Sequence, residues 1–149
     1  MYSLKQTLQT DMKAALRAGE KERLGVIRMA LAAIQRREVD ERVELDDPGV
    51  LQVIEKLVKQ GNESARQFEA GGRTDLVKKE LAEVEWLKGY MPEPLNDEAL
   101  SALIDEVIQA TGAESVRDMG KVMNAIREQV QGRADMGAVS SRVKEKLAV

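Results

Sequence analysis

Apolar residues recur at intervals of three or four positions along most of the chain, which is the spacing of an α-helix with one buried face. No stretch alternates apolar and polar residues as a half-buried strand does, so the sequence predicts helices throughout. Four helices are predicted before Pro92, with Gly19 separating the first two. Their inward residues are Leu4, Leu8, Met12 and Leu16; Leu24, Ile27, Leu31 and Ile34; Leu51, Ile54, Leu57, Val58 and Phe68; and Leu76, Val77, Leu81, Val84 and Leu87.

The breaks between these helices follow from loop composition and capping chemistry. The charged stretch Arg36–Asp47 lacks periodic apolar residues and is predicted to be a loop. Asp47 is predicted to cap the third helix, because it precedes Pro48 and proline suits the first helical position. Thr74 or Asp75 is predicted to cap the fourth helix.

A proline-containing segment, Tyr90-Met91-Pro92-Glu93-Pro94, marks a domain boundary. Proline lacks a backbone N–H and disfavours helical geometry in the residue before it, so no helix continues through this segment. The predicted fold is all-α, with an N-terminal helical bundle of about four helices in residues 1–91 and a small three-helix C-terminal tail domain in residues 92–149.

The tail has helix signals of its own. Asn96 or Asp97 is predicted to cap its first helix. Ser115 and Asp118 have the spacing of a capping box and are predicted to start the second helix, and Asp135 is predicted to cap the third. The inward residues are Leu100, Leu103, Ile104, Val107 and Ile108; Met119, Val122, Met123, Ile126 and Val130; and Val139, Val143 and Leu147.

Two clusters of glycine and charge in the tail carry a resemblance to a known family. They are Asp118-Met119-Gly120-Lys121-Val122-Met123 and Gly132-Arg133-Ala134-Asp135. Both resemble the tail shared by the GatB/YqeY family, which comprises the C-terminal domain of the transamidosome subunit GatB and the small free-standing YqeY proteins. One departure is that Met136 stands between Asp135 and the next glycine, whereas many relatives have glycine directly after the aspartate.

The resemblance to the free-standing, two-part, all-helical members runs nearly end to end. It is carried upstream by Arg28-Met29-Ala30-Leu31-Ala32-Ala33-Ile34, Lys59-Gln60, Gly72-Arg73-Thr74-Asp75-Leu76 and Tyr90-Met91-Pro92. In GatB-containing amidotransferases the tail domain is implicated in holding tRNA, while separate domains activate the misacylated end and transfer ammonia. The resemblance therefore implies a tRNA-binding accessory, and carbon–nitrogen ligase activity with glutamine as amide donor only by association, because fold similarity does not transfer chemistry.

The amino-acid composition excludes most kinds of catalytic site. The chain has no cysteine and no histidine, which excludes disulfides, thiolate nucleophiles and the commonest metal ligand. Gly120-Lys121 is followed by valine and lacks the upstream glycine of a phosphate-binding loop. Ser141 and Lys144 match a bare serine-x-x-lysine spacing without its supporting motifs. The sequence therefore predicts no catalytic residue, no metal ligand and no cofactor.

Charge is distributed unevenly within the tail. The whole chain has a net charge of −3, but residues 92–115 hold six acids and no base, whereas residues 116–149 hold seven bases and four acids. A local basic face decides where a polyanion docks. On a helical wheel of the second tail helix, Gly120, Lys121, Asn124 and Arg127 face outward, and Arg133 lies in the adjoining turn.

These five residues are the predicted nucleic-acid contact surface. An exposed helical glycine costs roughly 1 kcal/mol relative to alanine, so Gly120 suggests close approach of another backbone. Lys121 and Arg133 then supply charge to phosphates, and Asn124 supplies a neutral hydrogen bond. The competing interpretation is that Gly120 relieves packing against a neighbour and that Arg133 pairs with Asp118 or Asp135.

The sequence also gives expectations for the binding partner and the cellular location. Four aromatic residues form no array for stacking single-stranded bases, and Trp86 and Tyr90 are predicted to pack the two domains together. Structured RNA, specifically tRNA, is the expected partner, and a protein partner steered by the acidic segment 92–115 is the alternative. Without a membrane-spanning apolar run or a signal peptide, a cytoplasmic location is expected.

Overall fold

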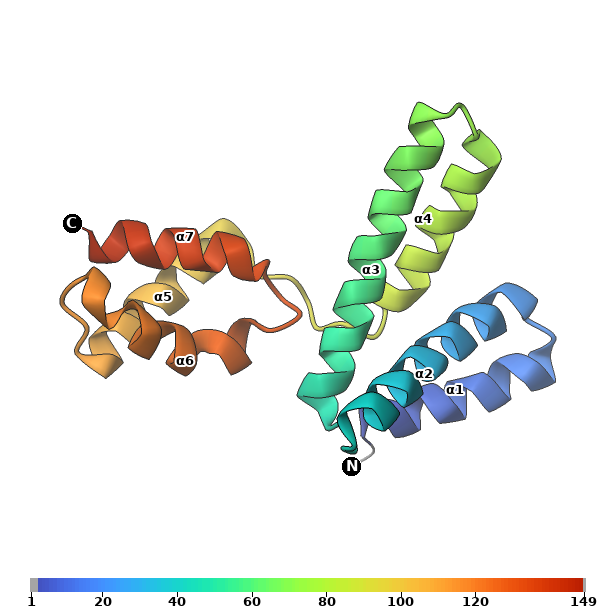
Figure 1. The fold of residues 1–149 in the computed structure, drawn as a ribbon, viewed down its shortest axis with the longest axis horizontal. Coiled ribbons are helices and arrows are strands. Elements are labelled where there is room, and N and C mark those ends of the chain that lie inside the picture. The colour runs from blue at the N-terminus through green and yellow to red at the C-terminus, as the bar shows by residue number, and fades with distance from the viewer. Residues whose placement is uncertain (1–2, 149) are drawn as a thin grey trace. The chain divides into compact units, whose positions relative to one another are not determined.

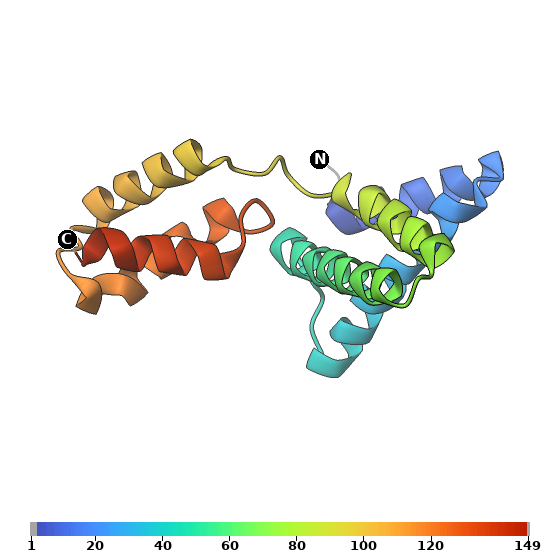
Figure 2. The ribbon, with the colours of Figure 1, turned by 90° about the horizontal axis from the view of Figure 1, so that it is seen from above.

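The structure is a computed structural model that describes residues 3–148. Within these residues the chain forms seven α-helices and one short 3₁₀ helix, without a strand, so the all-α prediction is confirmed (Figure 1). The helices belong to two compact units, Met1–Met91 and Pro92–Val149, and each unit has its own hydrophobic core. An extended segment without helix joins α4 (Thr74–Lys88) to α5 (Asp97–Thr111) (Figure 2).

The N-terminal unit consists of two helical hairpins. The first pairs α1 (Leu4–Ala18) with α2 (Lys21–Glu41), and the second pairs α3 (Asp47–Ala70) with α4 (Thr74–Lys88) (Figure 1). Both hairpins contribute to one apolar core, because each helix presents one apolar face to its neighbours. The buried residues of this core are Leu8, Ala15, Val26, Ile27, Ala30, Ile34, Val50, Val53, Ile54, Val58, Val84 and Leu87.

The apolar face of α1 differs from the prediction at its last turn. Ala15 is fully buried, whereas Leu16 is 58% exposed. A strict four-residue spacing advances about 40° per step around a helix, so Leu16 lies about 120° from Leu4 and has left the buried face. The start of α1 is well capped, since Ser3 and Gln6 form a reciprocal capping box.

The predicted loop Arg36–Asp47 is wrong over its first half, because α2 continues to Glu41. Polar contacts stabilise this end of α2 in place of apolar burial. The guanidinium of Arg37 donates to Glu41 at 2.6 Å and to Gln52 of α3 at 2.8 Å. Periodicity of apolar residues cannot reveal a helical turn that is held by such contacts.

The cap of α3 is one residue earlier than predicted. The side chain of Asp46 accepts a hydrogen bond from the Gly49 N–H at 3.0 Å and is the N-cap. The Asp47 carboxylate instead accepts from the Leu4 N–H at 2.8 Å, which ties α3 to the start of α1. Pro48 therefore occupies the second helical position.

The predicted cap of α4 is also wrong. Helix α4 begins at Thr74 with Arg73 in the cap position, and no side chain makes the capping hydrogen bond. Asp75 lies in the first turn and pairs with Arg73 at 3.2 Å. The hydrogen bond from Arg73 lowers the pKa of the Asp75 carboxyl.

Helices α3 and α4 approach closely at Gly61. A Cβ atom built on Gly61 would lie 2.6 Å from Cγ2 of Val84, far inside a normal carbon–carbon contact. Glycine at this position lets the two backbones pack, and any larger residue would push the second hairpin apart.

The C-terminal unit contains α5 (Asp97–Thr111), the 3₁₀ turn η1 (Val116–Asp118), α6 (Met119–Val130) and α7 (Met136–Leu147). The predicted caps Asn96 and Asp135 are confirmed, with hydrogen bonds from Ala99 N–H at 2.7 Å and Ala138 N–H at 3.1 Å. The buried residues of its core are Leu100, Ile104, Val107, Val122, Ile126, Val130, Val139, Val143 and Leu147.

The predicted capping box at the second tail helix does not form. The side chain of Ser115 makes no capping hydrogen bond, and Asp118 accepts from the Glu114 N–H at 2.9 Å. Residues 116–118 form one 3₁₀ turn, so α6 begins at Met119, later than the capping box indicates. This hydrogen bond from the Glu114 N–H is the main cause of a lowered pKa at Asp118, and the nearby charge of Lys121 lowers it further.

Trp86 and Tyr90 make their contacts inside the N-terminal unit. The Tyr90 hydroxyl donates to Asp11 of α1 at 2.6 Å, and the Arg23 guanidinium lies 5.7 Å from the centre of the Trp86 ring. These contacts hold the end of α4 against the first hairpin.

None of the helices in residues 3–148 combines the length and the apolar run that crossing a membrane requires.

Candidate nucleic-acid interface

Three of the five predicted contact residues lie on one outer face of α6. Gly120, Asn124 and Arg127 are spaced by four and three residues, which places them within about 60° of one another around the helix. All three are exposed, and the opposite side of α6 buries Val122 and Ile126. We call these three residues the α6 stripe.

No packing contact explains the glycine in the α6 stripe. A Cβ atom built on Gly120 would meet nothing within 4 Å, and its backbone has ordinary helical geometry. The interpretation that Gly120 relieves packing against a neighbour is therefore wrong for the described residues. Gly25 in α2 is equally open, so an open helical glycine is not by itself a sign of a binding site.

The side chains of Asn124 and Arg127 are available to bind a ligand. The guanidinium of Arg127 forms no ion pair or hydrogen bond with any side chain or carbonyl that the structure describes, and the Asn124 amide is likewise unengaged by residues 3–148. An arginine offers five N–H donors in a planar fork, and an asparagine offers a donor pair and an acceptor. Together they give the stripe one full positive charge and a neutral hydrogen-bonding group.

Lys121 lies farther around α6 and has a local contact. Its position is about 100° from Gly120, and its ammonium donates to the Thr111 carbonyl at 3.4 Å. The last carbonyls of a helix have no partner within the helix, and a cation there is favourable. Lys121 therefore supports the end of α5 and flanks the α6 stripe.

Arg133 is half-buried and is held against the start of its own unit. Its Nε–H donates to the Glu93 carbonyl at 2.9 Å, and its own carbonyl accepts from the Leu95 N–H at 2.9 Å. The turn that carries it depends on Gly132, whose φ of 74° suits glycine. The structure therefore gives Arg133 a role in chain connection that the sequence pattern did not indicate.

Two of the seven basic side chains in residues 116–149 form ion pairs inside the unit. Arg142 of α7 contacts Asp97 at 2.6 Å, and Lys146 of α7 contacts Asp105 of α5 at 2.8 Å. The acidic segment and the basic segment, separate in the sequence, thus partly neutralise each other. Arg117 and Arg127, at the start of η1–α6 and on the outer face of α6, are exposed arginines without an ion pair among residues 3–148.

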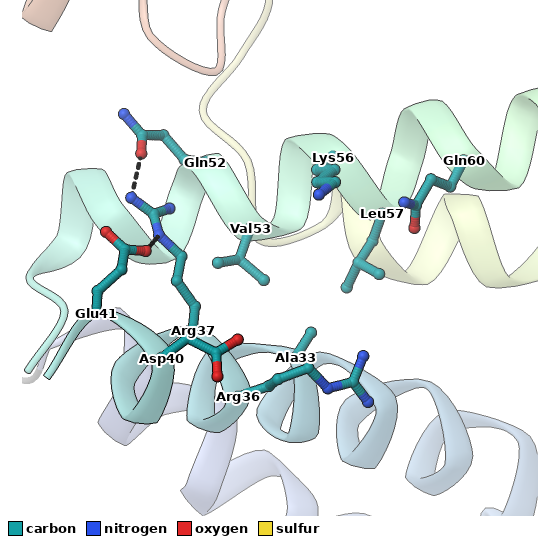
Figure 3. Close-up of a pocket in the computed structure, with 10 residues that line it drawn as sticks. All are labelled: Ala33, Arg36, Arg37, Asp40, Glu41, Gln52, Val53, Lys56, Leu57 and Gln60. Carbon is teal, nitrogen blue, oxygen red and sulfur yellow. Dashed lines mark hydrogen bonds and ion pairs between the residues drawn. The ribbon is translucent and has the colours of Figure 1, made fainter.

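Sequence reasoning missed a hollow in the N-terminal unit (Figure 3). It lies between α2 and α3 and has a volume of about 510 Å³. Val53 and Leu57 point into it from α3, and Arg37 closes one end through its hydrogen bonds to Glu41 and Gln52 (Figure 3). The only sequence signal for this hollow was the four-residue spacing of Arg37 and Glu41, which makes them neighbours on one helix face. Their contact with Gln52 forms only when α2 and α3 pack together.

The remaining candidate chemistry is dispersed. Among residues 3–148, no group of three or more acidic side chains is arranged to hold a metal ion. Ser141 and Lys144 are both exposed on α7. Glu80 and Glu83 share a face of α4, where partial burial and then the charge of Glu80 raise the pKa of Glu83. These arrangements add no catalytic group to the α6 stripe.

Comparison with known proteins matches residues 5–147 to the model of the YqeY-like protein family. The chain belongs to this family. The match includes both units and the connecting segment, so the resemblance to the free-standing family members is confirmed.

Three curated relatives of this YqeY-like protein carry one name, "Altered inheritance of mitochondria protein 41, mitochondrial". The relative from Pyrenophora tritici-repentis is 30% identical over 93% of this chain and 77% of its own length. The relative from Lachancea thermotolerans is 31% identical over 76% and 65%, and the one from Kluyveromyces lactis is 29% identical over 95% and 74%. For the Lachancea protein the match thus spans slightly less than two thirds of the relative.

These names overturn the expected cytoplasmic location. The relatives are named as mitochondrial proteins, whereas the expectation rested on the absence of a secretory signal and a membrane span. Neither observation distinguishes the cytoplasm from an organelle. The prediction of a cytoplasmic location for this YqeY-like protein is therefore wrong.

Proposed function

We propose that this YqeY-like protein is a non-catalytic accessory that binds tRNA through the outer face of α6. The observation that carries the proposal is the α6 stripe: an open glycine stands beside an unengaged amide and an unengaged guanidinium on one exposed helix face. A phosphate–sugar backbone is a ligand that uses all three features, because it approaches closely, accepts hydrogen bonds and carries negative charge.

Each residue has a distinct part in this proposal. Gly120 lets the nucleic-acid backbone lie against the helix, and Arg127 pairs with a phosphate. Asn124 adds a hydrogen bond between them. Lys121 contributes charge from the flank while it holds Thr111. Arg133 contributes less than the sequence predicted, because its guanidinium already donates to Glu93.

The link to glutamine-dependent amidotransferases is part of the proposal. It rests on the resemblance of residues 118–123 and 132–135 to the tail domain of GatB. We infer from it a role beside carbon–nitrogen ligase chemistry on tRNA, in which the activating and ammonia-transferring groups belong to other proteins. The absence of histidine and cysteine from the chain supports a role in binding over one in catalysis.

The test is binding of the full chain to bulk tRNA across a salt series, with an unstructured RNA as the control ligand. For Arg127→Ala, we expect weaker binding and a salt slope reduced by about one phosphate contact. Arg117→Ala is the matched control variant, since it removes an exposed arginine from η1, outside the stripe. Equal losses in both variants would show that the stripe has no special part.

Two other outcomes would change the functional assignment. Turnover of glutamine or aminoacyl-tRNA by the purified protein would contradict the accessory role. The absence of tRNA binding at any salt concentration would favour the alternative, a protein-interaction adaptor. One observation favours this alternative: the pairs Arg142–Asp97 and Lys146–Asp105 remove charge that nucleic-acid binding would use. In an adaptor, the open face at Gly120 receives a helix of the partner protein.

A further inference from the structure

The segment that joins the two units is short and is held at both ends. Helix α4 ends at Lys88, and the N-cap of α5 is Asn96. Between them, Tyr90 and Met91 belong to the first unit, and Pro92 to Leu95 belong to the second. The contacts that hold each end lie within the unit to which that end belongs.

Tyr90 anchors the segment to the N-terminal unit. Its hydroxyl donates to Asp11 of α1 at 2.6 Å, and both Tyr90 and Met91 pack against the apolar core. Arg23 lies 3.8 Å from the same Asp11 carboxylate, so a cation and a hydroxyl share one acceptor group. The backbone N–H groups of Tyr90 and Met91 also continue the last turn of α4 by bonding to Leu87 and Lys88.

Arg133 anchors the segment to the C-terminal unit. Its guanidinium Nε–H donates to the Glu93 carbonyl at 2.9 Å, and the Leu95 N–H donates to the Arg133 carbonyl at 2.9 Å. The side chain of Leu95 packs against the core of this unit. One residue in the α6–α7 turn thus holds the chain on both sides of Pro94.

Little backbone freedom remains between the two anchors. The ring of Pro92 fixes its φ near −65°. Met91 and Glu93 each precede a proline, which restricts both to extended geometry. Rotation is therefore left mainly to the ψ angle of Pro92.

We propose that Tyr90 and Arg133 act as two clasps that make the connecting segment semi-rigid, with rotation confined mainly to Pro92. A proline-containing segment that is held at both ends samples fewer backbone conformations than a free segment of the same length. Arg133 is then a positioning residue of the connection. This inference is independent of tRNA binding.

The test is backbone ¹⁵N relaxation of the full-length protein, read at the N–H groups of Met91, Glu93 and Leu95. In the unaltered chain we expect order parameters of about 0.85 at Glu93 and Leu95, the value of a rigid backbone. In Arg133→Ala we expect the order parameter of Glu93 to fall below about 0.6, the range of a flexible segment. Leu95 keeps its value, because its N–H still bonds to the backbone carbonyl of residue 133, and the amides of α5, α6 and α7 keep theirs. Arg127→Ala is the matched control and leaves all three probes unchanged.

Two further variants separate the clasps. Tyr90→Phe keeps the packed ring and removes only the hydroxyl, so the order parameter of Met91 falls and that of Leu95 stays. Pro92→Gly keeps both clasps and frees one φ angle, so Glu93 becomes more mobile while Leu95 stays rigid. If Arg133→Ala disrupts the C-terminal helices, Pro92→Gly alone decides between a restrained and a free connection.

Either of two results would overturn the proposal. One is an order parameter in the range of a flexible segment, below about 0.6, at Glu93 and Leu95 of the unaltered protein. The other is an Arg133→Ala or Pro92→Gly variant that folds and leaves the mobility at Glu93 unchanged.

Discussion

Replacing Gly120 by alanine is expected to stabilise the protein while it weakens tRNA binding. Alanine is favoured over glycine within a helix by up to about 1 kcal/mol, because glycine loses more backbone freedom on folding. The structure sets no cost against this gain, since the added Cβ meets nothing within 4 Å and the backbone is helical. Near the helix start the gain is smaller, so we expect about 0.5 kcal/mol.

Two other glycines that lie inside helices, Gly25 and Gly61, provide the controls. Gly25→Ala is equally free of contacts, so it also raises stability, and it leaves tRNA affinity unchanged. Gly61→Ala brings a Cβ to 2.6 Å from Val84, and overpacking of this kind costs typically about 1–3 kcal/mol, which exceeds the helix-propensity gain. The three variants therefore differ in the sign of their effect on stability although the substitution is the same.

Urea denaturation of the full chain followed by helical circular dichroism measures the stability changes, and the tRNA salt series measures binding. Since the two units have separate cores, the transition must be followed for each unit, with Trp86 reporting the first. A Gly120→Ala variant that is less stable than the parent would refute the open environment of this residue. A stabilised Gly120→Ala, or the longer Gly120→Gln, with undiminished tRNA affinity would refute the role of the stripe.

The remaining predictions concern ionisable groups of the N-terminal unit. Glu38 accepts hydrogen bonds from Lys5 and from the Leu45 N–H, which lower its pKa below the ordinary 4.5, so its stabilising contribution is complete above about pH 4.5 and is lost as the pH falls through the lowered value. Glu38→Gln is expected to remove this part of the acid sensitivity in pH-dependent denaturation curves, and an unchanged pH profile would contradict it. Partial burial, followed by the hydrogen bond to Asp11, raises the pKa of Tyr90 to about 12 from 10.0, so its contribution is complete below about pH 10 and is lost as the pH approaches 12. The phenolate absorbance of the parent protein, compared with that of Tyr90→Phe, is expected to show that Tyr90 ionises near pH 12. Asp11→Asn is expected to lower the pKa of Tyr90. Ionisation of Tyr90 near pH 10 in the parent protein would contradict the part-buried hydrogen bond to Asp11.

The sequence predicted those features that depend on neighbours along the chain. Helix period, the caps Asn96 and Asp135, and the proline stop after Tyr90 are local, and the structure has each of them. The errors occur where a distant segment supplies the stabilising contact. Helix α2 is longer than predicted because Gln52 and Glu41 hold Arg37, and this arrangement exists only after α3 packs beside α2.

The candidate site shows the same division. The outward positions of Gly120, Asn124 and Arg127 follow from helix geometry and could be predicted. The contacts of Arg133 with Glu93 and Leu95 could not, because Glu93 lies 40 positions before Arg133 and only the folded α5–α6–α7 core brings these residues together. The number of charges in a segment likewise gave no sign that Arg142 pairs with Asp97.

The position of Arg133 makes the two proposals separable. A phosphate contact and a clasp on Glu93 both predict an effect of Arg133→Ala, but they differ in where the effect is measured. Loss of a phosphate contact lowers the salt slope of tRNA binding and leaves Glu93 rigid, whereas loss of the clasp loosens Glu93 even without RNA. Because the Nε–H of Arg133 already donates to Glu93 at 2.9 Å, the second outcome is the one that the structure favours. The tRNA contact then depends on Arg127, whose guanidinium the described residues leave available.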